Sequence, residues 1–211
     1  MVLAGIDLAW QSEKNATAIA SGELRDGSLN LTKVFQDLYG VKTVLKTVLG
    51  EPGLQGIAID APLIIPNKTG QRRCEREIGI AYGSRKASCH TSNLTLYPEA
   101  TSVALSDHLL AQGFKHHGLG PGWQLECYPH PALIEIFSLE ERLLYKKGRV
   151  SQRREGQIQL GRYLRSLAHS RVLALSIPVE LSKYMEASYI ETLKGKALKH
   201  NEDLLDAIVC L

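Results

Sequence analysis

The stretch MVLAGIDLAW, residues 1–10, decides the fold that we expect for this chain. Val2 to Ile6 form a short apolar run, which is typical of a buried β-strand, and the run ends on a carboxylate at Asp7. An ionised side chain at the end of a buried strand needs a partner, a metal ion or water, because burial of an unpaired charge is costly. An aspartate in this place often only caps the following turn, so Asp7 alone leaves both interpretations open.

The same pattern occurs twice more along the chain. GIAID (residues 56–60) is an apolar run that ends on Asp60, and Pro62 then leads the chain out of the sheet. WQLECY (residues 123–128) predicts another strand, which carries Glu126 and is followed by two prolines. We therefore expect three strands that end in acids, which is harder to explain by turn capping than a single case.

The hydrophobic pattern along the rest of the chain predicts an α/β protein whose first three strands are antiparallel. After a turn at residues 11–15, the apolar run ATAIA and a third run follow in quick succession, as in a β-meander. Asp37 is the expected N-cap of the first helix, and Ser138 that of a short one. The expected elements are strands at 16–20 and 29–35 and helices at 37–49, 132–137, 155–168 and 178–193.

Composition is that of a globular protein without a membrane span. The chain has 211 residues, of which 44% are hydrophobic and 22% charged, and its net charge is +3. This mild excess of positive charge permits a nucleic-acid partner without establishing one. The four cysteines form no CxxC pair, so we expect free thiols in a reducing compartment and place the protein in the cytoplasm. The sequence gives no indication of oligomeric state.

The segment 66–122 breaks the regular pattern, and we interpret it as an insertion within a single domain that covers residues 1–211. It predicts helices at 72–81 and 98–112 and a mobile, glycine-rich loop at 113–122. Its basic residues could form an ordinary solvated helix face or a surface that contacts phosphates. The candidate nucleic-acid contacts are Arg72, Arg73, Arg76, Arg85 and Lys86.

The last stretch, KHNEDLLDAIVC (residues 199–210), predicts a helix that packs on the sheet. Asp203 and Asp206 are three residues apart, so they project from one side of this helix. Asp206 lies within an apolar run, and the small Ala207 beside it favours a close approach to the sheet. The chain ends at Leu211 without a helix stop signal, so we expect further C-terminal residues.

These acids together suggest a metal site. Four or more carboxylates brought together would repel one another unless divalent cations neutralised them, and hard oxygen ligands select Mg²⁺ or Mn²⁺. A two-metal site serves in-line displacement at phosphorus. The candidate ligands and catalytic residues are Asp7, Asp60, Glu126, Asp206 and, as a further ligand, Asp203.

The order of motifs GIDLAW, GIAIDAPL, RRCERE, ECYPHPAL with KKGR, and HNEDLLDAIVC resembles the DUF429 family of predicted nucleases. The resemblance covers nearly the whole chain and implies a ribonuclease H-like fold, a mixed sheet flanked by helices. It implies metal ligands at Asp7 and Asp206 and matches Asp60 and Glu126 to the family's other acidic motifs. Arg72, Arg73 and Glu75 match its arginine-rich motif, for which the resemblance implies no defined role.

Three functions from different classes remain open. The first is a nuclease in which two Mg²⁺ ions, held by Asp7, Asp206 and either Asp60 or Glu126, activate water and stabilise the leaving 3′ oxygen. The second is a phosphotransferase or ATPase of the actin and sugar-kinase type, although Asp7 is followed by Leu-Ala-Trp-Gln and not by a glycine-rich phosphate loop. The third is a nucleic-acid-binding module that has the fold but no catalytic activity.

Overall fold

The structure is a computed structural model that describes residues 1–12, 14–118 and 120–211. Residues 13 and 119, which belong to the turn expected at 11–15 and the loop expected at 113–122, lie outside the described residues.

A seven-stranded mixed sheet forms the centre of the molecule, with the strand order β5-β6-β4-β1-β2-β3-β7. The first three strands are antiparallel, as expected, and β4 is parallel to β1, β6 to β4, β5 to β6 and β7 to β3. This order is consistent with a ribonuclease H-like arrangement. The strands are β1 (Val2–Asp7), β2 (Thr17–Arg25), β3 (Ser28–Leu38), β4 (Leu54–Asp60), β5 (Lys115–His116), β6 (Trp123–Glu126) and β7 (Ala174–Ser176).

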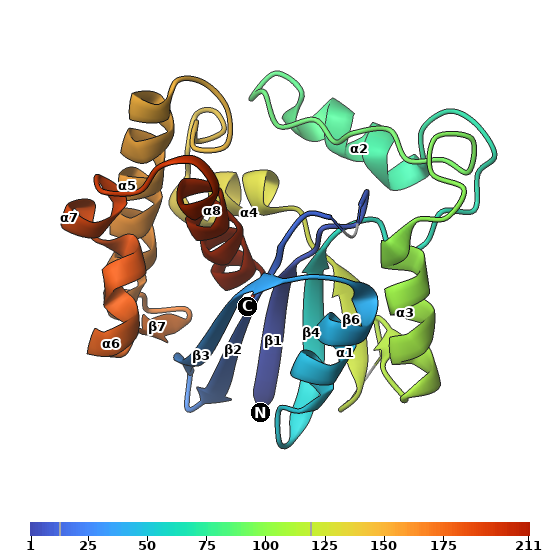
Figure 1. Ribbon diagram of the computed structural model, residues 1–211, viewed down its shortest axis with the longest axis horizontal. Coiled ribbons are helices and arrows are strands. Elements are labelled where there is room, and N and C mark those ends of the chain that lie inside the picture. Colours follow the sequence, from blue (N-terminus) through green and yellow to red (C-terminus); the bar gives the residue numbers. More distant parts are fainter. Residues whose placement is uncertain (13, 119) are drawn as a thin grey trace.

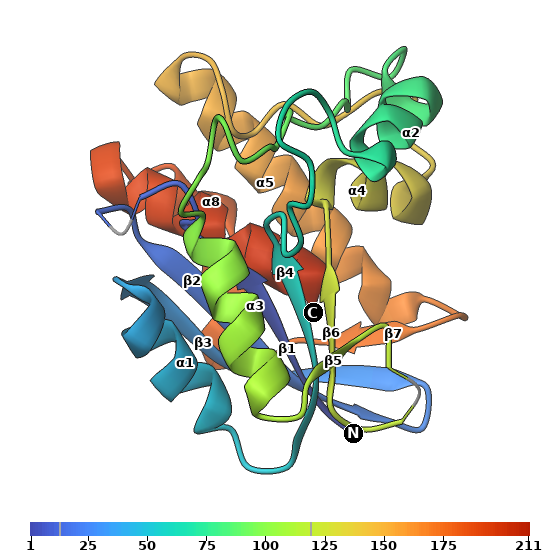
Figure 2. The same cartoon turned by 90° about the vertical axis from the view of Figure 1, so that its right-hand side faces the viewer.

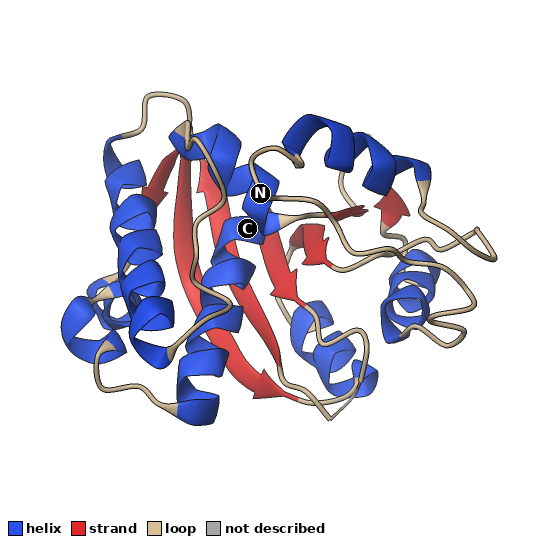
Figure 3. Ribbon diagram, turned by 90° about the horizontal axis from the view of Figure 1, so that it is seen from above, coloured by secondary structure: helices blue, strands red, loops and turns tan. Residues whose placement is uncertain are grey.

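Helices cover both faces of the sheet (Figure 1, and Figure 3 from above). On one face, α1 and α3 contact each other, and on the other face α8 lies across β1, β2 and β3 with α4 and α5 beside it. The helices are α1 (Val41–Leu49), α2 (Arg73–Tyr82), α3 (Thr101–Ala111), α4 (Pro129–Phe137), α5 (Val150–Ser166), α6 (Val179–Ser182), α7 (Ala187–Ile190) and α8 (Gly195–Cys210), with two 3-10 turns at Leu167–His169 and Lys183–Met185.

Alternation along β1 divides the core into two layers. Ala4 and Ile6 pack with α1 and α3, whereas Leu3 belongs to the layer under α5 and α8. Gly5 points to the same face as Leu3, and a Cβ on it would lie 2.1 Å from the Ala207 carbonyl oxygen and 2.4 Å from the Leu211 nitrogen. The absence of a side chain at Gly5 therefore allows α8 to lie directly on β1.

The segment 66–122 contributes to three parts of the fold. Figure 2 shows α3 lying along the sheet and α2 separately, near α4. The loop expected at 113–122 contains the short strand β5, which pairs with β6 at the sheet edge.

No helix within the described ranges is long and apolar enough to cross a membrane.

Several expected elements differ in the structure. The helix expected at 132–137 begins at Pro129, and the strand expected at 123–128 ends at Glu126. Asp37 does not cap a helix, because β3 continues to Leu38 and the N-cap of α1 is Gly40. Ser138 starts no helix; it is the left-handed C-cap of α4, with φ 51°. The helix expected at 178–193 is broken into α6, a 3-10 turn and α7. Finally, α5 begins at Val150, five residues before its expected start.

Candidate active site at the ends of the central strands

Asp7 and Asp60 lie side by side because their strands are parallel and in register. In the β1–β4 pairing, the last pair of residues is Asp7 opposite Asp60. Paired residues on neighbouring strands point to the same face of a sheet, and the strands are about 4.8 Å apart. Both carboxylates therefore project towards the face that α8 covers.

Helix α8 brings Asp206 to this place. The Asp206 side chain is completely buried, and its Oδ1 accepts a hydrogen bond of 2.5 Å from the hydroxyl of Tyr145, which is also completely buried. Nζ of Lys146 lies 2.6 Å from Asp206 Oδ2 and 3.5 Å from Asp60 Oδ2. Tyr145 and Lys146 belong to the loop between α4 and α5, so three separate parts of the chain meet at these acids.

Asp7, Asp60 and Asp206, here called the acid cluster, have too little positive charge beside them to neutralise three ionised carboxylates. Burial, and next to it the charge of Asp206, raises the pKa of Asp7 well above its ordinary value. Burial also raises the pKa of Asp60 to about 6, although Lys146 opposes this change. The pKa of Lys146 itself is raised: burial acts to lower it, but the attraction of Asp206 and the other acids outweighs burial. An additional cation would therefore stabilise the ionised acid cluster.

Asp203 lies one turn earlier on α8 and has a different partner. Its Oδ1 accepts a hydrogen bond of 2.5 Å from Nζ of Lys199. The same ammonium donates to Glu202 at 2.8 Å, and Glu202 also pairs with Arg153 at 3.1 Å. Asp203 thus lies at the edge of the acid cluster and pairs with Lys199, not with Lys146.

Glu126 is on the other face of the sheet. It pairs in register with Ile59, whose side chain belongs to the core layer of α1 and α3, so it points away from Asp60. Its carboxylate accepts two hydrogen bonds from the Arg72 guanidinium, at 2.6 and 2.8 Å. Arg72 also donates to the buried Glu75 at 2.7 Å. The structure thus brings Asp7, Asp60 and Asp206 together and places Glu126 in a separate ion-pair network.

The five basic residues singled out in the sequence all have partners within the chain. The Arg72 side chain is only 9% exposed, whereas that of Arg73 is 85% exposed. The partners are Glu75 and Glu126 for Arg72, Glu77 for Arg73, the Gln71 carbonyl for Arg76, Glu135 for Arg85 and Glu141 for Lys86. Arg72 therefore has a structural role, while the exposed members stay candidates for phosphate contact.

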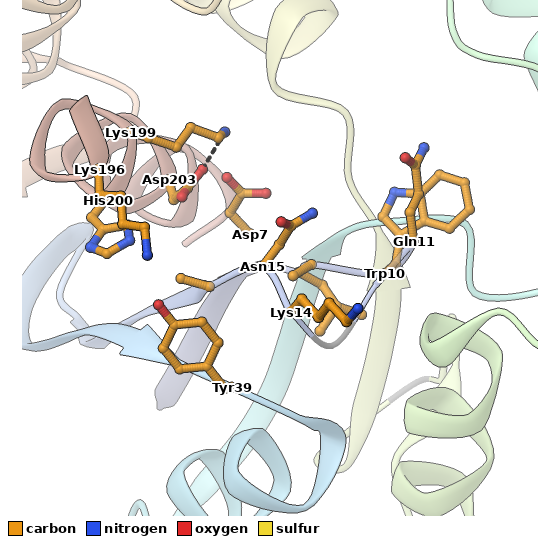
Figure 4. Close-up of a pocket in the computed structure, with 13 residues that line it drawn as sticks. Asp7, Trp10, Gln11, Lys14, Asn15, Tyr39, Lys196, Lys199, His200 and Asp203 are labelled. Atoms are coloured by element: carbon orange, nitrogen blue, oxygen red, sulfur yellow. Dashed lines mark hydrogen bonds and ion pairs between the residues drawn. The ribbon is translucent and has the colours of Figure 1, made fainter.

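Two pockets meet at Asp7. The first, here called the α8 pocket, has a volume of about 350 Å³ and lies between α8 and residues 7–11 and 14–16 (Figure 4). The second, here called the loop pocket, has a volume of about 300 Å³ and lies between the strand ends and residues 142–147. Their basic lining residues are Lys14, Lys196, Lys199 and His200 in the α8 pocket and His90, His130, Arg142, Lys146 and Lys147 in the loop pocket.

A family model described as "Protein of unknown function (DUF429)" matches residues 5–211. The chain belongs to the DUF429 family. No curated protein and no solved structure matches it. The family match includes both strand-end aspartates, the loop with Lys146 and all of α8, so the whole acid cluster lies within the DUF429 region.

The acid cluster of this DUF429 chain has the donor chemistry that a divalent cation needs. Carboxylate oxygens suit Mg²⁺ and Mn²⁺, and the buried Asp206 Oδ2 accepts no well-oriented hydrogen bond from the described residues, although Lys146 Nζ is close. Among the described residues, however, no group of three or more acidic, histidine or cysteine side chains is placed so that it could hold a metal ion. The acids suit a metal ion in chemistry and charge but not in their present geometry, because Lys146 lies where it would compete with that ion.

Sequence reasoning missed three residues of this DUF429 site: Tyr145, Lys146 and His130. His130 is 7% exposed, its Nδ1 has no hydrogen-bond partner among the described residues, and its ring lies between those of Tyr128 and Tyr145. Burial, with Lys146 as a further cause, lowers its pKa to about 4, so the imidazole is neutral. The motifs ECYPHPAL and KKGR contain His130 and Lys146, but nothing in their spacing indicates that they face acids from distant strands.

Proposed function

We propose that this DUF429 protein is a metal-dependent phosphodiesterase that hydrolyses nucleic acid. The observation that carries the proposal is the meeting of Asp7, Asp60 and Asp206 at the strand ends, where burial raises the pKa of the first two. Only Lys146 is in direct ionic contact with Asp60 and Asp206 among the described residues. Such a charge balance favours the binding of a divalent cation.

Asp7, Asp60 and Asp206 would hold Mg²⁺ or Mn²⁺, and when bound the metal supplies Lewis acidity and a water of lowered pKa. The chain's own residues have complementary roles. The Tyr145 hydroxyl fixes the orientation of the Asp206 carboxylate. Lys146, which lies beside Asp60 and Asp206, would contact a phosphate oxygen of the substrate. Lys199 and Lys196 line the other side of Asp7 and attract a polyanion to it.

The geometry supports a nuclease better than a kinase-like phosphotransferase. The residues after Asp7, Leu8 to Gln11, leave the sheet without a glycine turn that could bring backbone amides around a phosphate. The pockets on both sides of Asp7 suit a chain that passes across the acids, as a nucleic-acid backbone does.

A cleavage assay tests the proposal. Full-length protein is incubated with end-labelled single-stranded and duplex DNA and RNA in Mg²⁺, Mn²⁺ or EDTA, and Asp7→Asn is compared with Glu77→Gln. Glu77 is a matched acidic control, because it is exposed and pairs only with Arg73 among the described residues. We expect the wild type and Glu77→Gln to cleave nucleic acid in Mg²⁺ or Mn²⁺ but not in EDTA. We expect Asp7→Asn to cleave it in none of these conditions. The proposal would be overturned if Asp7→Asn cleaved nucleic acid at the wild-type rate. It would also be overturned if the protein hydrolysed ATP and left nucleic acid uncleaved.

A further inference from the structure

Trp10 occupies a distinctive position in this site. It lines both the α8 pocket and the loop pocket, and it follows Asp7 by three residues. Figure 4 shows Trp10 at one end of the α8 pocket and Lys196 and His200 at the other end, with Asp7 between them. An aromatic residue therefore lines both pockets, together with Asp7 and several basic side chains.

The surroundings of Trp10 hold this ring in place. The ring packs edge-to-face on Tyr97, with centroids 4.6 Å apart, and Gln11 donates a hydrogen bond to the Tyr97 hydroxyl at 3.4 Å. The Trp10 carbonyl accepts a hydrogen bond of 2.8 Å from the hydroxyl of Thr101, the first residue of α3. Trp10 is also partly buried against the core layer of α1 and α3, and it lines both pockets. The ring is thus a fixed platform that needs little ordering when a ligand binds.

A fixed indole in pockets that also hold basic side chains suits a nucleotide whose base is unpaired. Bases stack on aromatic side chains without regard to sequence, and basic residues follow the phosphates of the same strand. In a duplex the faces of the bases are covered by their neighbours, so a duplex cannot use this platform without unstacking. Each pocket has a volume at the lower end of the range for small-ligand sites.

We infer that the substrate is a single-stranded nucleic acid, one base of which stacks on Trp10 while the adjoining phosphodiester lies over Asp7 and Asp60. The inference rests on the proposed function for the reaction and adds the class of substrate. It assigns Trp10 a substrate-binding role and makes the α8 and loop pockets the sites of the nucleotides on either side of the scissile bond.

Tryptophan fluorescence tests the stacking directly and does not depend on activity. The chain has two tryptophans, so Trp123→Phe leaves Trp10 as the only one. Trp123 is part of β6 and packs over Gly56, away from both pockets. The variant is titrated in EDTA with a ten-nucleotide oligothymidylate, with an abasic oligomer of equal length and with a duplex. We expect quenching by oligothymidylate only, whereas binding of oligothymidylate without quenching would overturn the inference.

A second comparison uses the chain with Trp123 intact. The affinity of a labelled oligothymidylate, measured by anisotropy, should fall by roughly 5- to 150-fold in Trp10→Ala, the loss expected for one stacked base, and much less in Trp10→Phe. Equal affinity of Trp10→Ala and wild type would overturn the inference. Hydrolysis of nucleic acid without quenching would leave the proposed function standing and remove the stacking role of Trp10. Quenching without hydrolysis in metal would preserve the binding site and remove the proposed function.

Discussion

Nζ of Lys146 lies 2.6 Å from the buried Oδ2 of Asp206, in a contact that joins the loop before α5 to the C-terminal half of α8. The same ammonium is 3.5 Å from Asp60, so one lysine partly neutralises two acids from different elements. A lysine in this position compensates the acids when no metal is bound. It also opposes a divalent cation that would take the same place.

Replacement of Lys146 by methionine separates these two effects. In EDTA, Lys146→Met should lower the free energy of unfolding by about 3 kcal/mol, because it leaves the Asp206 charge buried without its cation. This value is at the low end for buried pairs, since the Lys146 side chain is 25% exposed. Mg²⁺ should then stabilise the variant more than the wild type. Urea unfolding in EDTA and in Mg²⁺ measures both effects, and Lys147→Met, at an exposed neighbour, is the control. Equal stability of Lys146→Met and wild type in EDTA would contradict the prediction.

The two aspartates of α8 should differ in their response to metal. Asp206 is buried within the acid cluster, whereas Asp203 is held by Lys199 at 2.5 Å. At a Mg²⁺ concentration of about 100 times Kd, a bound ion stabilises the folded state by about 2.7 kcal/mol. Asp206→Asn should remove most of this gain and Asp203→Asn little of it. Melting temperatures with and without Mg²⁺ decide between them, and a full gain in Asp206→Asn would exclude Asp206 as a ligand.

The sequence was sufficient to predict the parts of the site that depend on local pattern. An apolar run that ends in an acid located Asp7 and Asp60, and helical spacing placed Asp206 on a packed helix. The face to which a strand-end residue points depends on register, and a change of one residue reverses it. Glu126 therefore matches Asp60 in local sequence, but it projects from the opposite face and pairs with Arg72, 54 residues away.

Long-range contacts explain the rest of what could not be predicted. Tyr145 and Lys146 appear in the sequence only as part of a basic segment, and their contact with Asp206 depends on how α4 and α8 pack. The strand β7 has three residues, too few for a pattern, and exists because it pairs with β3. The N-cap expected at Asp37 failed because pairing with β2 extends β3 through that residue.

Gly5 is the position at which a single methyl group should separate α8 from the sheet. Because a Cβ there would lie 2.1 Å from a backbone oxygen of α8, Gly5→Ala must displace the helix, with a loss of about 3 kcal/mol in unfolding free energy, the upper end of the usual range for overpacking. Gly79→Ala is the matched control, since Gly79 lies within α2 and a Cβ on it would meet no atom within 4 Å. Urea unfolding should show Gly79→Ala unchanged or more stable. Equal stability of the two variants would contradict the close approach.

The two cationic surfaces make different predictions for the salt dependence of binding. Replacing Lys14 and Lys196 by glutamine, in the α8 pocket, should reduce the log–log salt slope for a single strand by about 0.7 for each lost phosphate contact. Replacing Arg73 and Arg76 by glutamine tests in the same way whether the surface of α2 contacts phosphates. Arg72→Gln should instead destabilise the fold, because it breaks the pairs with Glu75 and Glu126. Anisotropy at several salt concentrations measures the slopes, and an unchanged slope in the lysine variant would remove the α8 pocket from the phosphate path.

His130 should produce a specific loss of stability in mild acid. Its pKa is lowered from 6.5 to about 4, chiefly because burial disfavours the charged ring. Above pH 6.5 it is neutral in the folded and the unfolded chain, but at lower pH only the unfolded chain takes up the proton. The contribution of His130 to stability is therefore lost as the pH falls from 6.5 to 4, by up to about 3 kcal/mol.

The raised pKa of Asp60, about 6, acts in the opposite direction over an overlapping range, because its contribution is lost as the pH rises through 6. A comparison of wild type with His130→Gln isolates the histidine. As the pH falls from 6.5 to 4 in EDTA, the variant should gain stability relative to wild type by up to about 3 kcal/mol, as followed by urea unfolding at several pH values. His90→Gln, at an exposed position of the same pocket, is the matched control. Parallel curves for wild type and His130→Gln would mean that the His130 ring takes up its proton equally well in the folded chain, and that the loop pocket is open to water at this residue.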